Sequence, residues 1–131
     1  MLDASATMVL VMDDEPEDPV VPIVSAFRSG AAIVPALWRF EVANALDTAL
    51  RRGRVDEAGL ATAVRLIEGL DPVEDDAPPA LGWLLALAGR HGITPYDASY
   101  LSIALRRGIP LASLDRGLRG AATAAGVALV H

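Results

Sequence analysis

Four acidic residues stand where a chain of alternating strands and helices would bring them together. Asp3 follows the first apolar residues, Glu41 lies near the start of a helical pattern, Asp97 lies within "TPYDASYL", and Asp115 directly follows the apolar run "PLASL". In parallel α/β sheets, the carboxyl ends of the strands and the N-termini of the following helices meet at one edge, where ligands bind. We therefore expect these four carboxylates to converge at that edge.

Two of the four acids also have a simpler structural explanation. Asp115 fits an N-cap, and Thr94-x-x-Asp97 has the spacing of a capping box, a role worth about 1 kcal/mol. Asp97, however, shares a helical apolar stripe with Tyr100 and Leu101, which predicts that its carboxylate points into the protein. The sequence leaves both interpretations open.

The lack of lysine bears on how such a cluster would be neutralised. All eleven basic residues are arginine, and the chain has no cysteine. Glu41 is at helical spacing from Leu37 and Ala45, so we expect it to be partly buried as well. Unpaired buried carboxylates are costly, and a bound divalent cation removes that cost. Ligands that are oxygen only favour Mg²⁺ or Mn²⁺, whose bound water can be activated as a nucleophile.

The elements that must position these acids alternate between short apolar runs and longer helical patterns, which predicts an α/β fold. Expected strands cover residues 1–4, 31–34, 72–74, 110–114 and 127–130. Expected helices cover residues 5–12, 20–29, 36–52, 57–70, 77–90, 94–108 and 115–125. We predict a single domain over residues 1–131, with a central, mainly parallel sheet between layers of helices.

Composition excludes several classes of protein. Without cysteine there are no disulfides or thiolate metal sites, which suits a reducing cytoplasm. No apolar run reaches the roughly 18 residues of a membrane span, and the early Asp3 argues against a signal peptide, so we expect a soluble cytoplasmic protein. A net charge of −6 argues against a general nucleic-acid coating protein, although arginine suits phosphate recognition.

Two phosphoryl-transfer families are disfavoured by missing residues. "MVLVMDDEPEDP" is similar to the start of a two-component receiver domain, but receivers need a lysine, and the candidate phosphoacceptor Asp47 lies in a helical pattern. We therefore predict that this acidic run is a solvated loop. A haloacid-dehalogenase type of enzyme needs a lysine and a second acid two residues after Asp3, where this chain has Ser5.

Four segments carry a more extensive resemblance. "LDASA", "LWRFEVANAL", "HGITPYDASYLSIALRRGIPLASLD" and "AAGVALVH" resemble, in order and spacing, the PIN-domain ribonucleases, most closely the VapC-type toxins of bacterial toxin–antitoxin pairs. The resemblance covers nearly the whole chain, and "TPYDASYL" followed about eighteen residues later by "SLD" is its most specific part. One departure is that only Met1 and Leu2 precede the first aspartate, so the first strand is expected to be short.

The resemblance implies a PIN-like three-layer fold and a metal-dependent endoribonuclease. It assigns one or two Mg²⁺ or Mn²⁺ ions to the four acids Asp3, Glu41, Asp97 and Asp115, which would be both metal ligands and catalytic residues. The implied reaction is hydrolysis of an RNA phosphodiester bond by metal-bound water. A PIN-fold binding module with weak or no nuclease activity is the alternative.

Further positions follow from the same resemblance. Three polar residues would orient carboxylates or water from behind the metal ligands: Ser5, Asn44 and Ser113. Arg116 and Arg119 are candidate phosphate contacts, and their alternative is an ordinary solvated helix surface. The implied partners are an RNA substrate, a cognate antitoxin protein and a second copy of the chain in a homodimer.

Overall fold

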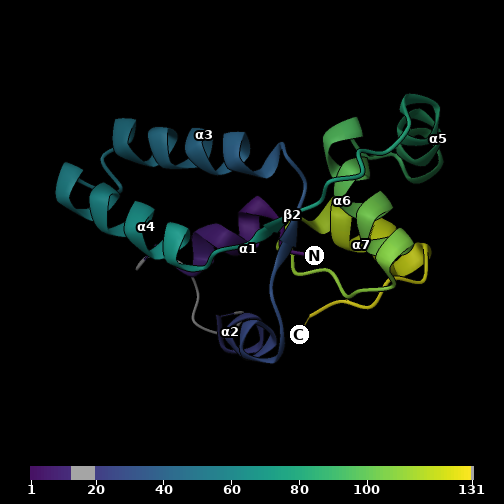
Figure 1. The fold of residues 1–131 in the computed structure, drawn as a ribbon. Coiled ribbons are helices and arrows are strands. Elements are labelled where there is room, and N and C mark those ends of the chain that lie inside the picture. Colours follow the sequence, from purple (N-terminus) through teal and green to yellow (C-terminus); the bar gives the residue numbers. More distant parts are fainter. Residues whose placement is uncertain (13–19, 131) are drawn as a thin grey trace.

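The computed structural model describes residues 1–12 and 20–130 and arranges them as helices around a parallel sheet (Figure 1). The predicted acidic loop at residues 13–18 lies outside the described residues. The elements in chain order are α1 (Ala4–Val9), α2 (Val20–Ser29), β1 (Ile33–Val34), α3 (Trp38–Arg51), α4 (Glu57–Gly69), β2 (Val73–Glu74), α5 (Leu81–His91), α6 (Pro95–Arg107) and α7 (Arg116–Ala124).

Five short extended segments form the centre of the fold. β1 and β2 pair in parallel, with Ile33 opposite Val73, and parallel bridges join Leu2 to Ala112 and Leu111 to Leu129. The Leu2 backbone N–H donates to the Ile33 carbonyl at 3.0 Å, which connects the two sets. In space the segments therefore run in the order 73–74, 33–34, 1–3, 111–113 and 128–130, as in a doubly wound sheet. The prediction of a parallel α/β fold is confirmed.

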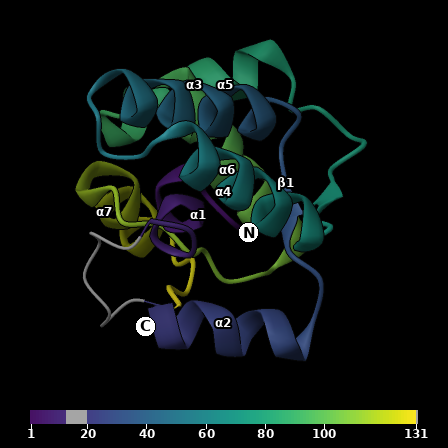
Figure 2. The same ribbon diagram turned by 90° about the vertical axis from the view of Figure 1, so that its left-hand side faces the viewer.

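Helices cover this sheet in layers. Figure 1 shows α1, α3 and α4 on one side of the central segments, and α5, α6 and α7 on the other. The view turned by 90° shows α2 lying apart from the upper helices, beyond α1 and the N-terminus (Figure 2). Within residues 1–12 and 20–130, no helix is both long and apolar enough to cross a membrane.

Local capping signals set the bounds of the best-defined helices. α6 starts at the predicted Thr94-Pro95 pair and ends at Gly108, whose φ of 62° is the left-handed conformation that glycine adopts most easily. α4 starts after the predicted cap Asp56, which accepts a hydrogen bond from the Gly59 N–H at 2.8 Å. Asp47 lies inside α3, paired with Arg51, so it does not end a strand as a receiver phosphoacceptor would.

Two sets of predicted bounds were wrong. Residues 77–80 are irregular rather than helical, because Pro78 and Pro79 disfavour helical geometry in the residues before them, and α5 begins only at Leu81. The first helix occupies Ala4–Val9 rather than 5–12. The strands expected at 1–4, 110–114 and 127–130 are reduced to bridged residues, although their hydrogen bonds still build the sheet.

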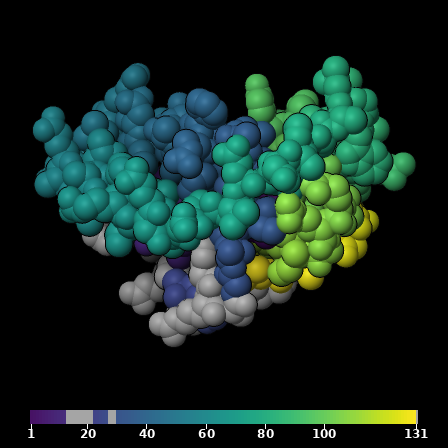
Figure 3. All heavy atoms as spheres, viewed as in Figure 1, coloured from purple at the N-terminus to yellow at the C-terminus, as the bar shows by residue number. Residues whose placement is uncertain are grey.

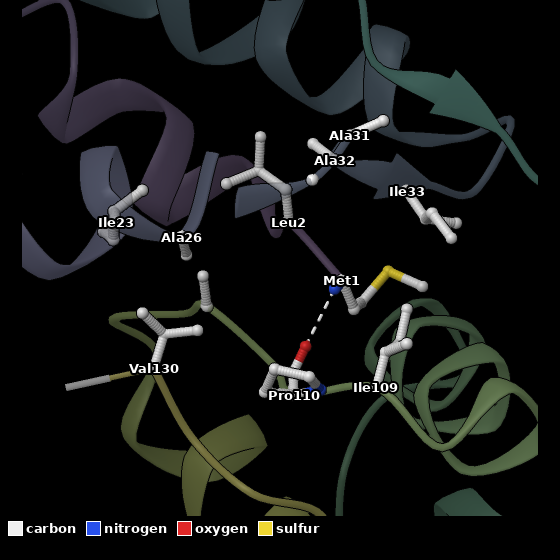
Figure 4. Close-up of a pocket in the computed structure, with 12 residues that line it drawn as sticks. Met1, Leu2, Ile23, Ala26, Ala31, Ala32, Ile33, Ile109, Pro110 and Val130 are labelled. Atoms are coloured by element: carbon white, nitrogen blue, oxygen red, sulfur yellow. Dashed lines mark hydrogen bonds between the residues drawn. The ribbon is translucent and has the colours of Figure 1, made fainter. Parts of the chain in front are cut away.

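An apolar pocket of about 200 Å³ lies between α2 and the end of the sheet where the strands begin (Figure 4). Its lining includes Met1, Ile23 and Ile33. The Met1 ammonium donates a 2.8 Å hydrogen bond to the Pro110 carbonyl, and burial lowers the pKa of this amine to about 6. This pocket lies at the opposite end of the strands from the expected acid cluster.

Candidate active site

Asp3 is the most enclosed of the four predicted acids. It follows the bridged residue Leu2, and its side chain is buried, with 7% of the residue exposed. Its Oδ2 accepts hydrogen bonds from Ser5 Oγ at 2.5 Å and from Ser113 Oγ at 2.6 Å. Each hydroxyl in turn accepts a backbone N–H, from Leu114 at 2.9 Å and from Asp115 at 3.1 Å. These N–H donors orient both hydroxyl protons toward Asp3.

Glu41 lies in the first turn of α3, and its carboxylate is held by a side chain of α6. The Tyr100 hydroxyl donates a hydrogen bond to Glu41 Oε2. Tyr100 is fully buried, and its pKa is raised by burial and by the negative charge of Glu41. The phenol therefore stays protonated and acts as a donor.

Three of the four carboxylates act on one another electrostatically. Burial raises the pKa of Asp3 above its ordinary value; the two serine hydroxyls oppose this, and the negative charge of Asp97 adds to it. Burial likewise raises the pKa of Glu41, against the Tyr100 hydroxyl, and the charges of Asp3 and Asp97 raise it further. Like charges at this edge of the sheet thus disfavour full ionisation, which a bound cation would reverse.

Asp97 forms the capping box that its spacing allows. Thr94 Oγ1 and the Thr94 N–H donate to Asp97 Oδ2 at 2.7 and 3.3 Å, and the Asp97 N–H donates to Thr94 Oγ1 at 3.1 Å. The carboxylate is half-buried, and its charge still reaches Asp3 and Glu41. Since the cap uses one carboxylate oxygen, capping and a role at the site are compatible.

Asp115 is the most exposed of the four acids. Its Oδ1 caps α7 by accepting the Leu118 N–H at 2.7 Å. It connects to Asp3 through Ser113, whose hydroxyl accepts the Asp115 N–H and donates to Asp3. The structure therefore brings Asp115 to the same edge of the sheet, where a single serine hydroxyl links its backbone to the Asp3 carboxylate.

The remaining predicted residues lie around this edge. Arg119 donates from Nη1 to the Ser113 carbonyl at 2.9 Å, so its guanidinium is held beside the site. Arg116 is exposed in the first turn of α7. Asn44 is exposed on α3, one turn after Glu41.

A buried polar link that the sequence analysis did not predict fixes α3 against Asp3. Trp38 Nε1 donates to Thr7 Oγ1 at 2.9 Å, and Thr7 Oγ1 donates to the Asp3 carbonyl at 3.0 Å. Both side chains are buried, and Trp38 begins α3. The link therefore holds the helix that carries Glu41 in place. The general rule that buried aromatic N–H and O–H groups need partners is the signal that points to Trp38 and Tyr100.

The donor atoms and the negative charge of this arrangement suit a metal cation, but the spacing of the side chains does not. The donors are carboxylate and hydroxyl oxygens, which hard cations prefer. Among residues 1–12 and 20–130, however, no three His, Cys, Asp or Glu side chains lie close enough together to hold one ion. Three of these carboxylates would therefore have to move closer together to hold one cation, whose positive charge would offset the repulsion between them.

Comparison with known proteins identifies the family. Residues 1–124 match the model of the PIN domain. The chain is 37% identical over 79 residues to exonuclease VapC9 of Pyrobaculum aerophilum, a match that spans 60% of this chain and 58% of that protein. It is 31% identical over 128 residues to ribonuclease VapC3 of the same organism, which covers 90% of each chain.

A solved structure supports the same relationship. The crystal structure of PAE2754 from Pyrobaculum aerophilum superposes with a TM-score of 0.68 at 30% identity, over 92% of this chain and 83% of that one. The sheet order, the acids at its edge and the match over nearly the full length agree with one another. This chain belongs to the PIN-domain family.

Proposed function

We propose that this protein is a metal-dependent endoribonuclease that hydrolyses RNA phosphodiester bonds in the cytoplasm and acts as the toxin of a toxin–antitoxin pair. The proposal rests on one observation: three carboxylates lie near enough at the carboxyl edge of the sheet for their negative charges to repel one another. They belong to Asp3, Glu41 and Asp97. The relatives named ribonuclease VapC3 and exonuclease VapC9 support the same class of reaction.

PIN-domain nucleases generally use divalent metal ions. In this chain Asp3, Glu41 and Asp97 would be the principal ligands of Mg²⁺ or Mn²⁺, and Asp115 would be a further ligand or would orient water. When bound, the ion would supply a water of lowered pKa and would offset charge on the phosphate.

The protein's own contribution is to hold these groups in place. Ser5 and Ser113 fix Asp3 through hydroxyl protons that cannot turn away without losing their backbone donors. Tyr100 fixes Glu41. Arg119 is anchored through one of its five N–H donors, which leaves its positive charge beside the site for a phosphate. Arg116 and Asn44 would contact RNA or water at the rim.

RNA cleavage tests the proposal directly. Purified protein should cleave single-stranded RNA with Mg²⁺ or Mn²⁺ and stop in excess EDTA, and Asp3→Asn should be inactive under both conditions. A matched control is Asp56→Asn, which changes a helix cap away from the site. Cleavage by Asp3→Asn at the wild-type rate would refute the site, and metal-loaded wild type without cleavage would favour the binding-module alternative.

Exposed apolar side chains support the proposed protein partners. On α5, Leu81 is 74% exposed and Leu85 is 58% exposed at the i, i+4 spacing of one helix face, and on α4 Leu66 is 53% exposed. Apolar faces of this kind suit a second copy of the chain and an antitoxin helix. Light scattering of the protein alone, and growth rescue by the antitoxin encoded beside it, test the two partners separately.

A further inference from the structure

Two aromatic side chains beside the acid cluster project into solvent. Phe40 is 76% exposed and Tyr96 is 66% exposed, although the chain has only six aromatic residues in all. Each directly precedes a proposed ligand: Phe40 precedes Glu41, and Tyr96 precedes Asp97. Burying an aromatic ring is one of the larger contributions to folding, so exposing two of them at this place contributes nothing to stability.

Both rings lie on helix turns that carry residues of the site. Tyr100, which donates to Glu41, lies one helical turn after Tyr96, so Tyr96 extends the same face of α6 toward solvent. Phe40 is in the first turn of α3, the turn that Tyr100 holds. The N-terminal end of α3 and the upper end of α6 face each other in Figure 1, and the outline of the molecule is notched between them in Figure 3.

The charge of the site makes a non-electrostatic contact useful. A chain of net charge −6 with clustered carboxylates does not attract RNA over long distances as a basic protein does. Base stacking on aromatic rings does not depend on charge and tolerates any base. Arg39, exposed next to Phe40, adds one local positive charge for the backbone.

We propose that Phe40 and Tyr96 are stacking platforms that hold unpaired RNA bases on the two sides of the phosphate to be cleaved. This inference rests on the proposed function and assigns to Phe40 and Tyr96 the contacts with the bases of the RNA, which require bases that can be splayed apart. Bases within an A-form duplex are already stacked and cannot reach the rings. Duplex RNA of the same sequence is therefore a poor ligand for this surface.

Binding measurements separate the platforms from the cleavage step. The probe is a fluorescein-labelled single-stranded RNA dodecamer of mixed sequence. Its fluorescence anisotropy is measured as protein is added, in a buffer that contains Ca²⁺ as the divalent cation. Phe40→Ala and Tyr96→Ala should each raise Kd by about fivefold to a hundredfold, which corresponds to about 1–3 kcal/mol per stacked base. Tyr96→Phe, which keeps the ring, should restore binding. Val64→Ala, which shortens an exposed apolar side chain on α4, is the control and should leave Kd unchanged.

An abasic RNA makes the test specific to stacking. Removing one base beside the cleaved phosphate should weaken binding to the wild type but not to the variant that lacks the partner ring, as in a double-mutant cycle. Equal effects of the ring variants on single-stranded and duplex RNA, or effects no larger than that of Val64→Ala, would overturn the inference. So would the conversion of a dimer into a monomer by Phe40→Ala or Tyr96→Ala in light scattering, because the rings would then be a protein interface.

The same experiment distinguishes this inference from the proposed function. Wild-type protein that binds single-stranded RNA through both rings, yet cleaves it with neither Mg²⁺ nor Mn²⁺, would support the stacking role and refute the proposed nuclease activity. If cleavage is lost in Asp3→Asn while both ring variants keep the wild-type kcat/KM, the proposed nuclease activity is supported and the stacking role is refuted.

Discussion

Asp97→Asn separates the two roles that the structure gives to one carboxylate. The capping hydrogen bonds from Thr94 use Oδ2 alone, and the amide oxygen of asparagine can accept them in its place. Loss of a whole cap costs about 1 kcal/mol, which would lower Tm by about 3–5 °C in a domain of this size. Asparagine should cost much less, and it removes a negative charge that raises the pKa of Asp3 and of Glu41. We therefore expect the metal-free Tm of Asp97→Asn to equal or exceed that of the wild type.

The cleavage rate should move in the opposite direction. A site for a hard cation that loses one of three carboxylates should lose more than about 100-fold in RNA cleavage. Thr94→Ala is the matched control, because it breaks the capping box and keeps the Asp97 charge: its metal-free Tm should fall by about 3–5 °C while most of the cleavage remains. Both quantities should be measured on the same preparations, with Tm in EDTA. Wild-type cleavage together with a lowered Tm in Asp97→Asn would make Asp97 a capping residue only, and the multi-acid site would be wrong.

Four further predictions rest on contacts at the site and at the edge of the sheet. Mg²⁺ or Mn²⁺ should raise the Tm of the wild type in proportion to the logarithm of its concentration and leave Asp3→Asn unchanged. Because the folded state raises the Asp3 pKa, the metal-free wild type should lose stability relative to Asp3→Asn as the pH rises from about 4 through the folded pKa; an unchanged difference from pH 4 to 8 would contradict the assigned burial. Tyr100→Phe removes the hydroxyl that donates to Glu41, so kcat should fall by about 10- to 100-fold. The Kd for RNA, measured with the labelled dodecamer, should change little. An unchanged kcat would show that the hydroxyl only fills space. Asp75, whose side chain is 1% exposed, accepts from Arg106 and Arg107 at 2.5 Å each, while the arginine side chains are 43% and 32% exposed. Removing both arginines leaves the buried Asp75 carboxylate without a partner and should lower the free energy of unfolding in urea by about 3–5 kcal/mol. Asp75→Ala leaves two arginines that water can reach, so it should lower the free energy of unfolding by less. The reverse order would refute this account.

Asp97 and Asp115 combine a role in the fold with their proposed role at the site. Both accept backbone N–H groups at the starts of helices, and both stand at the edge of the sheet where a parallel α/β fold places its ligands. The helix start fixes where such a carboxylate lies, and the second oxygen is available for chemistry. Capping therefore positions these acids and does not compete with their proposed role.

Features that depend on near neighbours along the chain could be predicted from the sequence. The start and end of α6 follow from Thr94-Pro95 and Gly108, and the start of α4 follows from Asp56, because caps act within one turn. The alternation of apolar runs and helical stripes predicted a parallel α/β sheet, and with it the common edge at which the acids lie. Even the missed start of α5 had a local signal, in Pro78-Pro79.

Which side chains meet depends on how distant parts of the chain pack together. The bond from Tyr100 to Glu41 joins residues 59 apart, and the bond from Ser113 to Asp3 joins residues 110 apart. The positions of α3 and α6 around the sheet, and of one strand end beside another, create these pairs, and no periodicity along the chain encodes them. The distances among the carboxylates were likewise undetermined by the sequence, because they balance burial and hydrogen bonding against mutual repulsion, and each of these energies depends on all the elements that surround the site.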